Sequence, residues 1–493
     1  MMSPLDFIAL CIYAVLLISI GIWGYSKVKN ANDFYIGGGK VPWWLSGVSH
    51  HVSGYSAVIF TGYATIAYRN GISIYFWWAL SIALMLILGS YLIAPRWARL
   101  RKELNIQSPT TYLATRYGLP TQQLIAWSGV LLKLLDVAAK WVAIAVILKA
   151  FVGIDLTTGI LIGSSISLLY ISFGGFWADL ANDFFQFILQ LVAGLVMFFA
   201  VLNHFEGWGG FVEAWQTLPA ANRNPLNEPY DIWYTIFFAI VLFMSYNGGT
   251  WNLAMRFMAS PDARSAQKTA RLSAILYIIW PVILFMPMWI SPVIFPGLGD
   301  EAGTVYALLA EKFIPAGLYG LVLGGMIAAT LTMTASDTNA ISAVITQDVL
   351  PVLFPKKFER KSITLKAARI TTALFMAVTI VIALNHESFG GIIGLIITWF
   401  GALLGPSAMP LLLGLLPIYK NCDQTAAITT MIVGFAVFAL FKFLPVPYSL
   451  AVGGPSLASL FTFSLFAVLN RNKTCRPEVE QLVNTASGIS LKS

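Results

Sequence analysis

A polar stretch at residues 49–56 (SHHVSGYS) interrupts an apolar run that extends from about residue 41 to residue 68. Two histidines, three serines and a glycine would be costly at this depth in a membrane helix that faces lipid. A helix that is broken in mid-membrane instead exposes backbone carbonyls and half-helix ends, which suit the coordination of ions and substrates. The stretch therefore predicts a broken helix in the binding site of a transporter.

A second polar stretch at residues 243–252 (FMSYNGGTWN) also carries glycines in the middle of an apolar segment. Lys133, Asp136 and Lys140 form a further polar group, whose i, i+3 and i+7 spacing places them on one face of a helix. Inside a membrane these charges should face the protein interior. They either neutralise one another as a structural triad or recognise hydroxyl groups, because carboxylate and ammonium groups make charge-assisted hydrogen bonds to polyols.

The elements that carry these residues must be membrane helices. Of the 493 residues 58% are hydrophobic and only 11% are charged, whereas soluble domains are about a quarter charged. The net charge of +8 fits Lys and Arg in cytoplasmic loops better than a nucleic-acid partner. Short loops without HExxH, P-loop or GxSxG motifs argue against an enzyme, and no organic cofactor or obligate protein partner is predicted.

Hydropathy predicts about thirteen membrane-spanning helices. With the N-terminus outside and the C-terminus inside, 23 of the 30 Lys and Arg fall in cytoplasmic stretches, as the positive-inside rule requires. The two polar stretches lie five spans apart, so two units of five spans start from opposite sides and form an inverted repeat. The predicted order within this single all-α domain is an additional helix at 5–26, a first repeat at 43–203, a second repeat at 231–416, two further helices at 424–469 and a cytoplasmic tail at 470–493.

Several motifs are similar to those of the sodium/solute symporter family, which includes sodium/glucose, sialic acid and proline symporters. The likeness extends over roughly residues 5–470, and it implies a leucine-transporter-like 5+5 fold, alternating access and coupling to sodium. It also implies a multi-pass protein of the cell (inner or plasma) membrane whose partners are a small solute, sodium and the lipid bilayer. The motifs are 33–39 (DFYIGGG) with 41–44 (VPWW), 174–177 (GGFW) with 182–186 (NDFFQ), 346–348 (TQD) and 405–406 (GP).

The resemblance implies a main sodium site made of carbonyls from the first broken helix, with a carbonyl and two hydroxyls from a later helix. At the second hydroxyl position this chain has a methionine, and a thioether is a poor ligand for a hard cation. Ser53, Thr330 or a water molecule could supply the missing oxygen. The candidate ligands are Val52, Tyr55, Ala329, Thr332 and Met333 for this site, and Asp183 with Ser336 for the second site that some members have, unless Asp183 is only a structural carboxylate.

The substrate is expected between the two broken helices, and a sugar or sugar acid is the favoured class. Sugar transporters of the family have an aromatic gate at the position of Tyr246, but their acidic or amide residue is replaced by Trp77-Trp78 and their lysine by Tyr277. Aromatic rings stack on sugars and suit other apolar-faced solutes equally. The predicted substrate-binding residues are Ser56, Trp78, Lys133, Asp136, Tyr246, Asn247, Tyr277 and Thr398.

Asp337 has no counterpart in the family pattern, and an intramembrane carboxylate is a functional candidate by default. It could strengthen a cation site, carry a proton, or pair with His50 or His51. Each histidine is either a packed residue bonded to a neighbouring helix or a pH sensor. A proton-coupled symporter of the same fold for an amino acid or organic acid, and a transporter-like sensor, therefore stay open as alternatives.

Overall fold

The computed structural model describes residues 3–356, 365–389 and 404–489. Within these ranges the chain forms helices and loops without a β-strand, and nine of the helices are long and apolar enough to cross a membrane. The all-helical polytopic architecture expected from the sequence is thereby confirmed. The count of about thirteen spans, their orientation and the division into repeats at residues 43–203 and 231–416 stay predictions.

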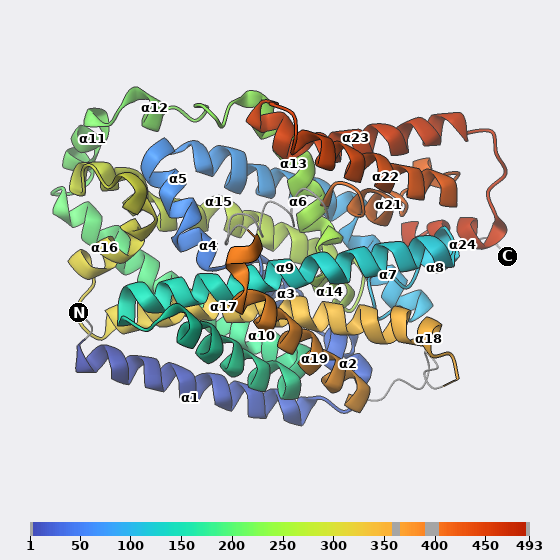
Figure 1. The fold of residues 1–493 in the computed structure, drawn as a ribbon, viewed down its shortest axis with the longest axis horizontal. Helices are drawn as coiled ribbons and strands as arrows, with labels where there is room; N and C mark the ends of the chain where they lie inside the picture. The colour runs from blue at the N-terminus through green and yellow to red at the C-terminus, as the bar shows by residue number, and fades with distance from the viewer. Residues whose placement is uncertain (1–2, 357–364, 390–403, 490–493) are drawn as a thin grey trace.

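The long helices pack side by side in one elongated bundle (Figure 1). α10 packs against α1, α9, α15 and α17 and consists of two helical segments joined at a kink. The kink lies at Gly175, whose φ of 54° is open to glycine at little steric cost. The long helices are α1 (Pro4–Lys27), α9 (Leu119–Val152), α10 (Leu156–His204), α15 (Ala263–Ile294), α17 (Leu318–Val344) and α19 (Leu365–Leu384).

The N-terminus and the C-terminus lie at opposite ends of the bundle (Figure 1). α11, α12 and α16 lie at the end that holds the N-terminus, and α8, α18 and α24 at the other end. α24 packs against α7 and α8, so the predicted tail at 470–493 contains a docked helix. The bounds are α7 (Ala94–Leu104), α8 (Leu113–Arg116), α11 (Trp208–Thr217), α12 (Ala220–Arg223), α16 (Val305–Phe313), α18 (Leu350–Leu353) and α24 (Pro477–Ser487).

The first polar stretch is a helix break, as expected. α3 ends at Val52, and α4 begins at Ala57, four residues after Ser53. Ser56 caps α4, and its hydroxyl accepts the Val58 N–H at 3.4 Å. The Ala57 N–H, which has no partner within its own helix, donates to the hydroxyl of Thr330 at 2.7 Å. The segments are α2 (Ala31–Ile36), α3 (Trp43–Val52), α4 (Ala57–Phe60), α5 (Gly62–Asn70), a π-helical segment (Tyr75–Leu80) and α6 (Ser81–Leu92).

The second polar stretch is also a break. α13 passes into a π-helical turn in which Gly248 has a φ of 112°, and Trp251 then adopts a φ of 67°. A positive φ at a tryptophan is strained and persists only when the surroundings enforce it. The indole N–H of Trp97 donates to the carbonyl of Asn247 at 3.0 Å. The segments are α13 (Ile232–Met244), the turn (Ser245–Gly249), α14 (Asn252–Met258), and the helices α21 (Ala408–Leu413), α22 (Gln424–Phe441) and α23 (Tyr448–Leu469) further along the chain.

A buried carboxylate fixes the π-helical segment (Ile345–Val349) that continues α17. Asp348 accepts hydrogen bonds from the hydroxyls of Ser108, Thr110 and Thr111 and from the amide of Gln122, at 2.5–2.8 Å. The donors come from the loop between α7 and α8 and from the start of α9. One carboxylate therefore satisfies four donors from two other parts of the chain.

Replacing Asp348 with alanine should lower the unfolding free energy by about 3 kcal/mol or more, because several buried donors lose their acceptor. Thermal unfolding of the purified protein in detergent measures the loss. Asp300→Ala is the matched control, since its exposed side chain pairs with Arg69 at the surface. Equal melting temperatures for the two variants would contradict this role of Asp348.

Candidate functional site

A cavity of about 110 Å³ lies between the two helix breaks. Its wall is formed by the first break and α4, the π-helical segment before α6, α9, the second break and α17. The cavity therefore lies where the sequence places a substrate. Of the predicted substrate-binding residues, Ser56, Trp78, Lys133, Asp136 and Tyr246 line it.

The other predicted substrate-binding residues are placed elsewhere. The side-chain amide of Asn247 turns away and donates to backbone carbonyls of α13 and α6 at 2.9 and 3.2 Å. The hydroxyl of Tyr277 donates to the carbonyl of His51 at 3.2 Å, behind the cavity wall. Thr398 lies outside the described residues. The roles of these three residues stay predictions.

Aromatic rings form one side of the cavity and pack in two layers. The ring of Tyr277 stacks on Tyr55 at 5.6 Å and meets Trp78 and Tyr246 edge-on at 5.7 and 5.4 Å. Gly54 makes this close packing possible, since a Cβ atom there would lie 2.0 Å from the hydroxyl of Tyr277. The break in the first helix and the aromatic wall therefore depend on each other.

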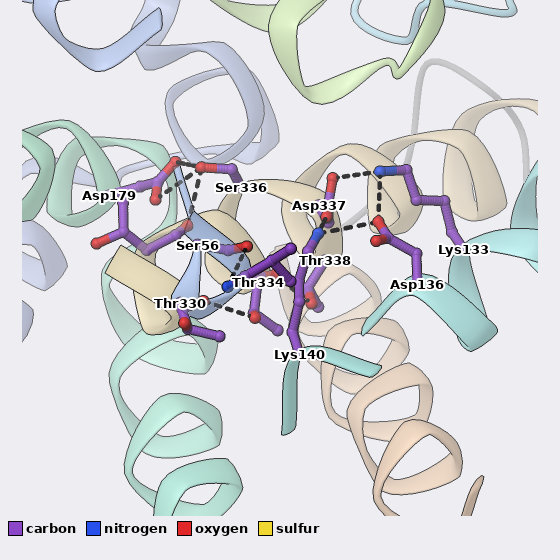
Figure 2. A network of polar contacts seen from close by, with 12 residues as sticks. Ser56, Lys133, Asp136, Lys140, Asp179, Thr330, Thr334, Ser336, Asp337 and Thr338 are labelled. Atoms are coloured by element: carbon purple, nitrogen blue, oxygen red, sulfur yellow. Dashed lines mark hydrogen bonds and ion pairs between the residues drawn. The ribbon is translucent and has the colours of Figure 1, made fainter. Parts of the chain in front are cut away.

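The charged stripe of α9 is completed by Asp337 of α17 (Figure 2). Lys133 contacts Asp136 at 3.0 Å and Asp337 at 2.7 Å. Lys140 contacts Asp136 at 2.9 Å and also Asp337. We call these four buried residues the charge quartet. Its two ammonium groups and two carboxylates sum to zero charge, which is how ionised groups are tolerated inside a membrane protein.

The quartet settles which groups Asp337 contacts and leaves part of Asp136 facing the cavity. Each oxygen of Asp337 accepts from a different lysine, so this carboxylate pairs with α9 and not with a histidine. Both lysines contact the same Asp136 oxygen, Oδ2, so neither engages Oδ1. Asp136 and both lysines line the cavity. The arrangement can offer a carboxylate oxygen to a solute hydroxyl without losing its charge balance.

The predicted main sodium ligands lie in the first break and on α17, and the hydrogen bond from the Ala57 N–H to Thr330 joins these two elements. Val52, Tyr55, Ala329 and Thr332 are all at most 1% exposed, whereas Met333 lines the cavity. Backbone carbonyls and a hydroxyl are the oxygen donors that a hard cation prefers. The residues present thus suit a sodium ion, but they supply one oxygen donor fewer than the site that the family resemblance implies.

The hydroxyls near this position have partners from other helices. Thr332 accepts a hydrogen bond from the amide of Asn182 in α10. Thr330 accepts the N–H of Ala57 and so joins α4 to α17. In the described part of the chain, no group of three or more His, Cys, Asp and Glu side chains could hold a metal ion.

The predicted second sodium ligands lie against a buried arginine. Arg256 of α14 contacts Asp179 and Asp183 of α10 and donates to Ser336 of α17. Its Nε also donates to Ser49 at 3.1 Å, and Ser49 donates to Asp183. Two carboxylates face one guanidinium here, and among the described residues nothing bonds to Asp183 Oδ1.

Residues 34–434 match the sodium:solute symporter family. The chain belongs to that family. It is 24% identical to a sodium/sialic acid symporter of Proteus mirabilis over 443 residues, and this alignment covers 85% of this chain and 86% of the relative. It is 23% identical to a sodium/glucose cotransporter of Vibrio parahaemolyticus over 486 residues, and this alignment covers 91% of this chain and 87% of the relative.

The fold of this symporter is similar to that of a Na⁺-coupled sialic acid symporter solved in a substrate-bound, outward-open state. The TM-score is 0.82 at 20% identity, covering 95% of this chain and 98% of the other. Together with the family match, this confirms the expected family and leucine-transporter-like architecture. The symporter is a multi-pass transporter of the plasma membrane and not an enzyme.

The two histidines of the first break have different surroundings. His50 bonds through Nδ1 to Ser273 at 2.9 Å and through Nε2 to the carbonyl of Tyr246 at 3.1 Å. His51 lies among the rings of Tyr55 and Tyr277, and within the described residues neither of its ring nitrogens has a partner. His50 is thus a packed histidine that holds the first break against the second.

Sequence reasoning missed the buried role of Arg256. It counted this arginine among the cytoplasmic charges, but the residue is fully buried in α14. It also passed over Asp179, which lies one helical turn before Asp183 on the same face of α10. The i, i+4 spacing of two acids in a membrane helix is the signal that could have revealed a buried cation.

Replacing Asp337 with asparagine should destabilise the symporter by about 3–5 kcal/mol, because two buried ammonium groups would then share one carboxylate. Adding Lys140→Met removes the excess charge and should recover part of the loss. Melting temperatures in detergent measure both effects. A double variant no more stable than Asp337→Asn would show that charge balance in the quartet does not govern stability.

Proposed function

We propose that this symporter takes up a sugar, sugar acid or similar polyol by alternating access, coupled to inward movement of sodium. The observation that carries the proposal is the cavity between two helix breaks, bounded by an aromatic wall and the charge quartet. Broken helices at the centre of an inverted repeat are the usual binding elements of secondary transporters. The relatives named for sialic acid and glucose support the same solute class.

The cavity wall supports a polyhydroxylated solute. Trp78 and Tyr246 offer aromatic faces on one side, which suit the apolar face of a sugar ring. Asp136 and Lys133 border the other side, where a carboxylate accepts from a hydroxyl and an ammonium group donates to one. Because both lysines already contact carboxylates, the described residues of the cavity wall supply no cation reserved for an anionic solute. A neutral sugar or polyol fits this balance best.

The donor set near the first break supports sodium as the coupling ion. The carbonyls of Val52, Tyr55 and Ala329 and the hydroxyl of Thr332 are all neutral oxygens, which suit a monovalent hard cation. At the second predicted site, two carboxylates face the single guanidinium of Arg256, and Asp183 Oδ1 has no partner among the described residues. A further cation could bind there, beside Ser336.

The contacts of Asp337 weigh against proton coupling. A carboxylate that carries protons must exchange them during the transport cycle, whereas both oxygens of Asp337 are held by ammonium groups of α9 as their structural counter-ion. Asp337 is 0% exposed and is not among the residues that line the cavity. Two alternatives to a sodium-coupled symporter are a proton-coupled symporter and a transporter-like sensor. The experiment that follows distinguishes the three.

Sodium should stabilise the purified symporter against heat, because a ligand that binds only the folded state raises its stability by about 2.7 kcal/mol at a hundredfold excess over Kd. Potassium and choline at equal ionic strength are the controls. Proteoliposomes should accumulate solute when a sodium gradient is imposed. Uptake that persists in choline but collapses when the proton gradient is dissipated would replace sodium with protons, and binding without accumulation would indicate a sensor.

The aromatic wall predicts how uptake responds to substitution. Tyr246→Ala should lower kcat/KM about three- to tenfold through the lost ring contact, whereas Tyr246→Phe keeps the ring and most of the activity. Tyr91→Ala is the matched control, because Tyr91 is exposed on α6, away from the cavity. Competition with panels of sugars, sugar acids and amino acids identifies the solute. Inhibition by amino acids alone would overturn the sugar assignment.

A further inference from the structure

The contacts between α10 and α17 place Gln186 at the height of the main ion site. Asn182 of α10 donates to Thr332 of α17, and two turns further along α10 the side chain of Gln190 lies against Gly325. The two helices therefore run antiparallel here. Gln186 lies midway between these contacts, one helical turn from Asn182, and so comes level with the turn of α17 that precedes Thr332.

The contacts between α10 and α3 place Ser53 at the same height. Ser49 bonds to Asp183, and the ring of His51 lies 6.1 Å from that of Phe187, so α3 runs parallel to α10. The N–H of Ser53 donates to the carbonyl of Ser49 at 2.9 Å, which continues the helical turn. The residues one helical turn after Ser49 therefore lie beside the residues one turn after Asp183 in α10. This register brings Ser53 toward Gln186.

Both side chains carry buried polar atoms that no described residue satisfies. Gln186 and Ser53 are 0% exposed, and neither the amide oxygen and nitrogen of Gln186 nor the hydroxyl of Ser53 has a hydrogen-bond partner within the described ranges. Native proteins pair the great majority of their buried polar groups, and each unsatisfied one is costly. Two unsatisfied side chains at one level, beside the predicted ion ligands, indicate a ligand at that level.

We infer that Gln186 and Ser53 supply the oxygen donors that the sodium site lacks at Met333. This inference rests on the proposed sodium coupling. Met333 faces the cavity, and the hydroxyl of Thr330 is engaged by the N–H of Ala57. The amide oxygen of Gln186 and the hydroxyl of Ser53 are neutral, hard donors of the kind sodium prefers. Ser53 also borders the cavity, so the ion and the solute share a wall.

The test measures sodium binding directly, through thermal stabilisation of the purified full-length symporter in detergent. Sodium chloride is titrated against choline chloride at constant ionic strength, and the sodium concentration for half-maximal stabilisation is recorded. Gln186→Leu and Ser53→Ala should each raise this midpoint about tenfold or more through the lost contact to a charged ligand. Gln190→Leu is the matched control, because it removes a buried amide one turn further along the same helix, and its midpoint should not change.

A rescue variant separates ligation from a general loss of packing. Met333→Ser restores a hydroxyl, so it should lower the sodium midpoint of Gln186→Leu toward the wild-type value. If Gln186→Leu does not fold, the sodium midpoints of Ser53→Ala and Gln186→Glu are compared instead. Gln186→Glu keeps an oxygen at the same place. Wild-type midpoints in Gln186→Leu and Ser53→Ala, with a raised midpoint in Thr332→Ala, would overturn the inference and leave sodium coupling intact. No sodium-specific stabilisation of the wild type would overturn both.

Discussion

A bilayer supplies no water to the polar groups of a helix, so each of them must be satisfied inside the protein. This constraint acts most strongly on α17, where Ser336 and Asp337 are neighbours in the chain but face different helices (Figure 2). Ser336 bonds to Asp179 of α10 and Arg256 of α14. Asp337 accepts from both lysines of α9. Two charge clusters thereby hold α17 between its neighbours and fix the height of every other residue on it.

The helix breaks depend on the same constraint. A broken turn leaves backbone groups without partners, which costs several kcal/mol per group in hydrocarbon. Thr330 satisfies the N–H of Ala57 at the start of α4, and the indole of Trp97 satisfies the carbonyl of Asn247 at the second break. Side chains from other helices thus stabilise the breaks, and the cavity lies where the two breaks face each other. Its position follows from the polar contacts and not from a shortage of packing.

Local patterns made much of this architecture predictable. The polar stretches revealed both breaks, and the stripe of α9 was readable because i, i+3 and i+7 residues share a face regardless of tertiary context. The partners of Asp337 were not readable, since they lie about 200 positions away. Counting charges by loop assigned Arg256 to the membrane surface, although its cluster draws it inside. Asn247 was expected to contact the substrate, but it lies in a π-helical turn, where the register of side chains shifts, and its amide bonds to backbone carbonyls.

The proposed ion ligands and the cavity wall share the first break and α17, and this has a thermodynamic consequence. An ion that bridges the carbonyls of Val52 and Tyr55 to Thr332 would order the turn that also carries Ser53 and Ser56. A solute that binds next would then lose less conformational freedom, because part of its site is already ordered. Linkage makes the effect mutual, so the bound solute must strengthen ion binding by the same factor. Coupling of this kind needs no long pathway, since the proposed ion ligands and part of the cavity wall lie on one broken helix.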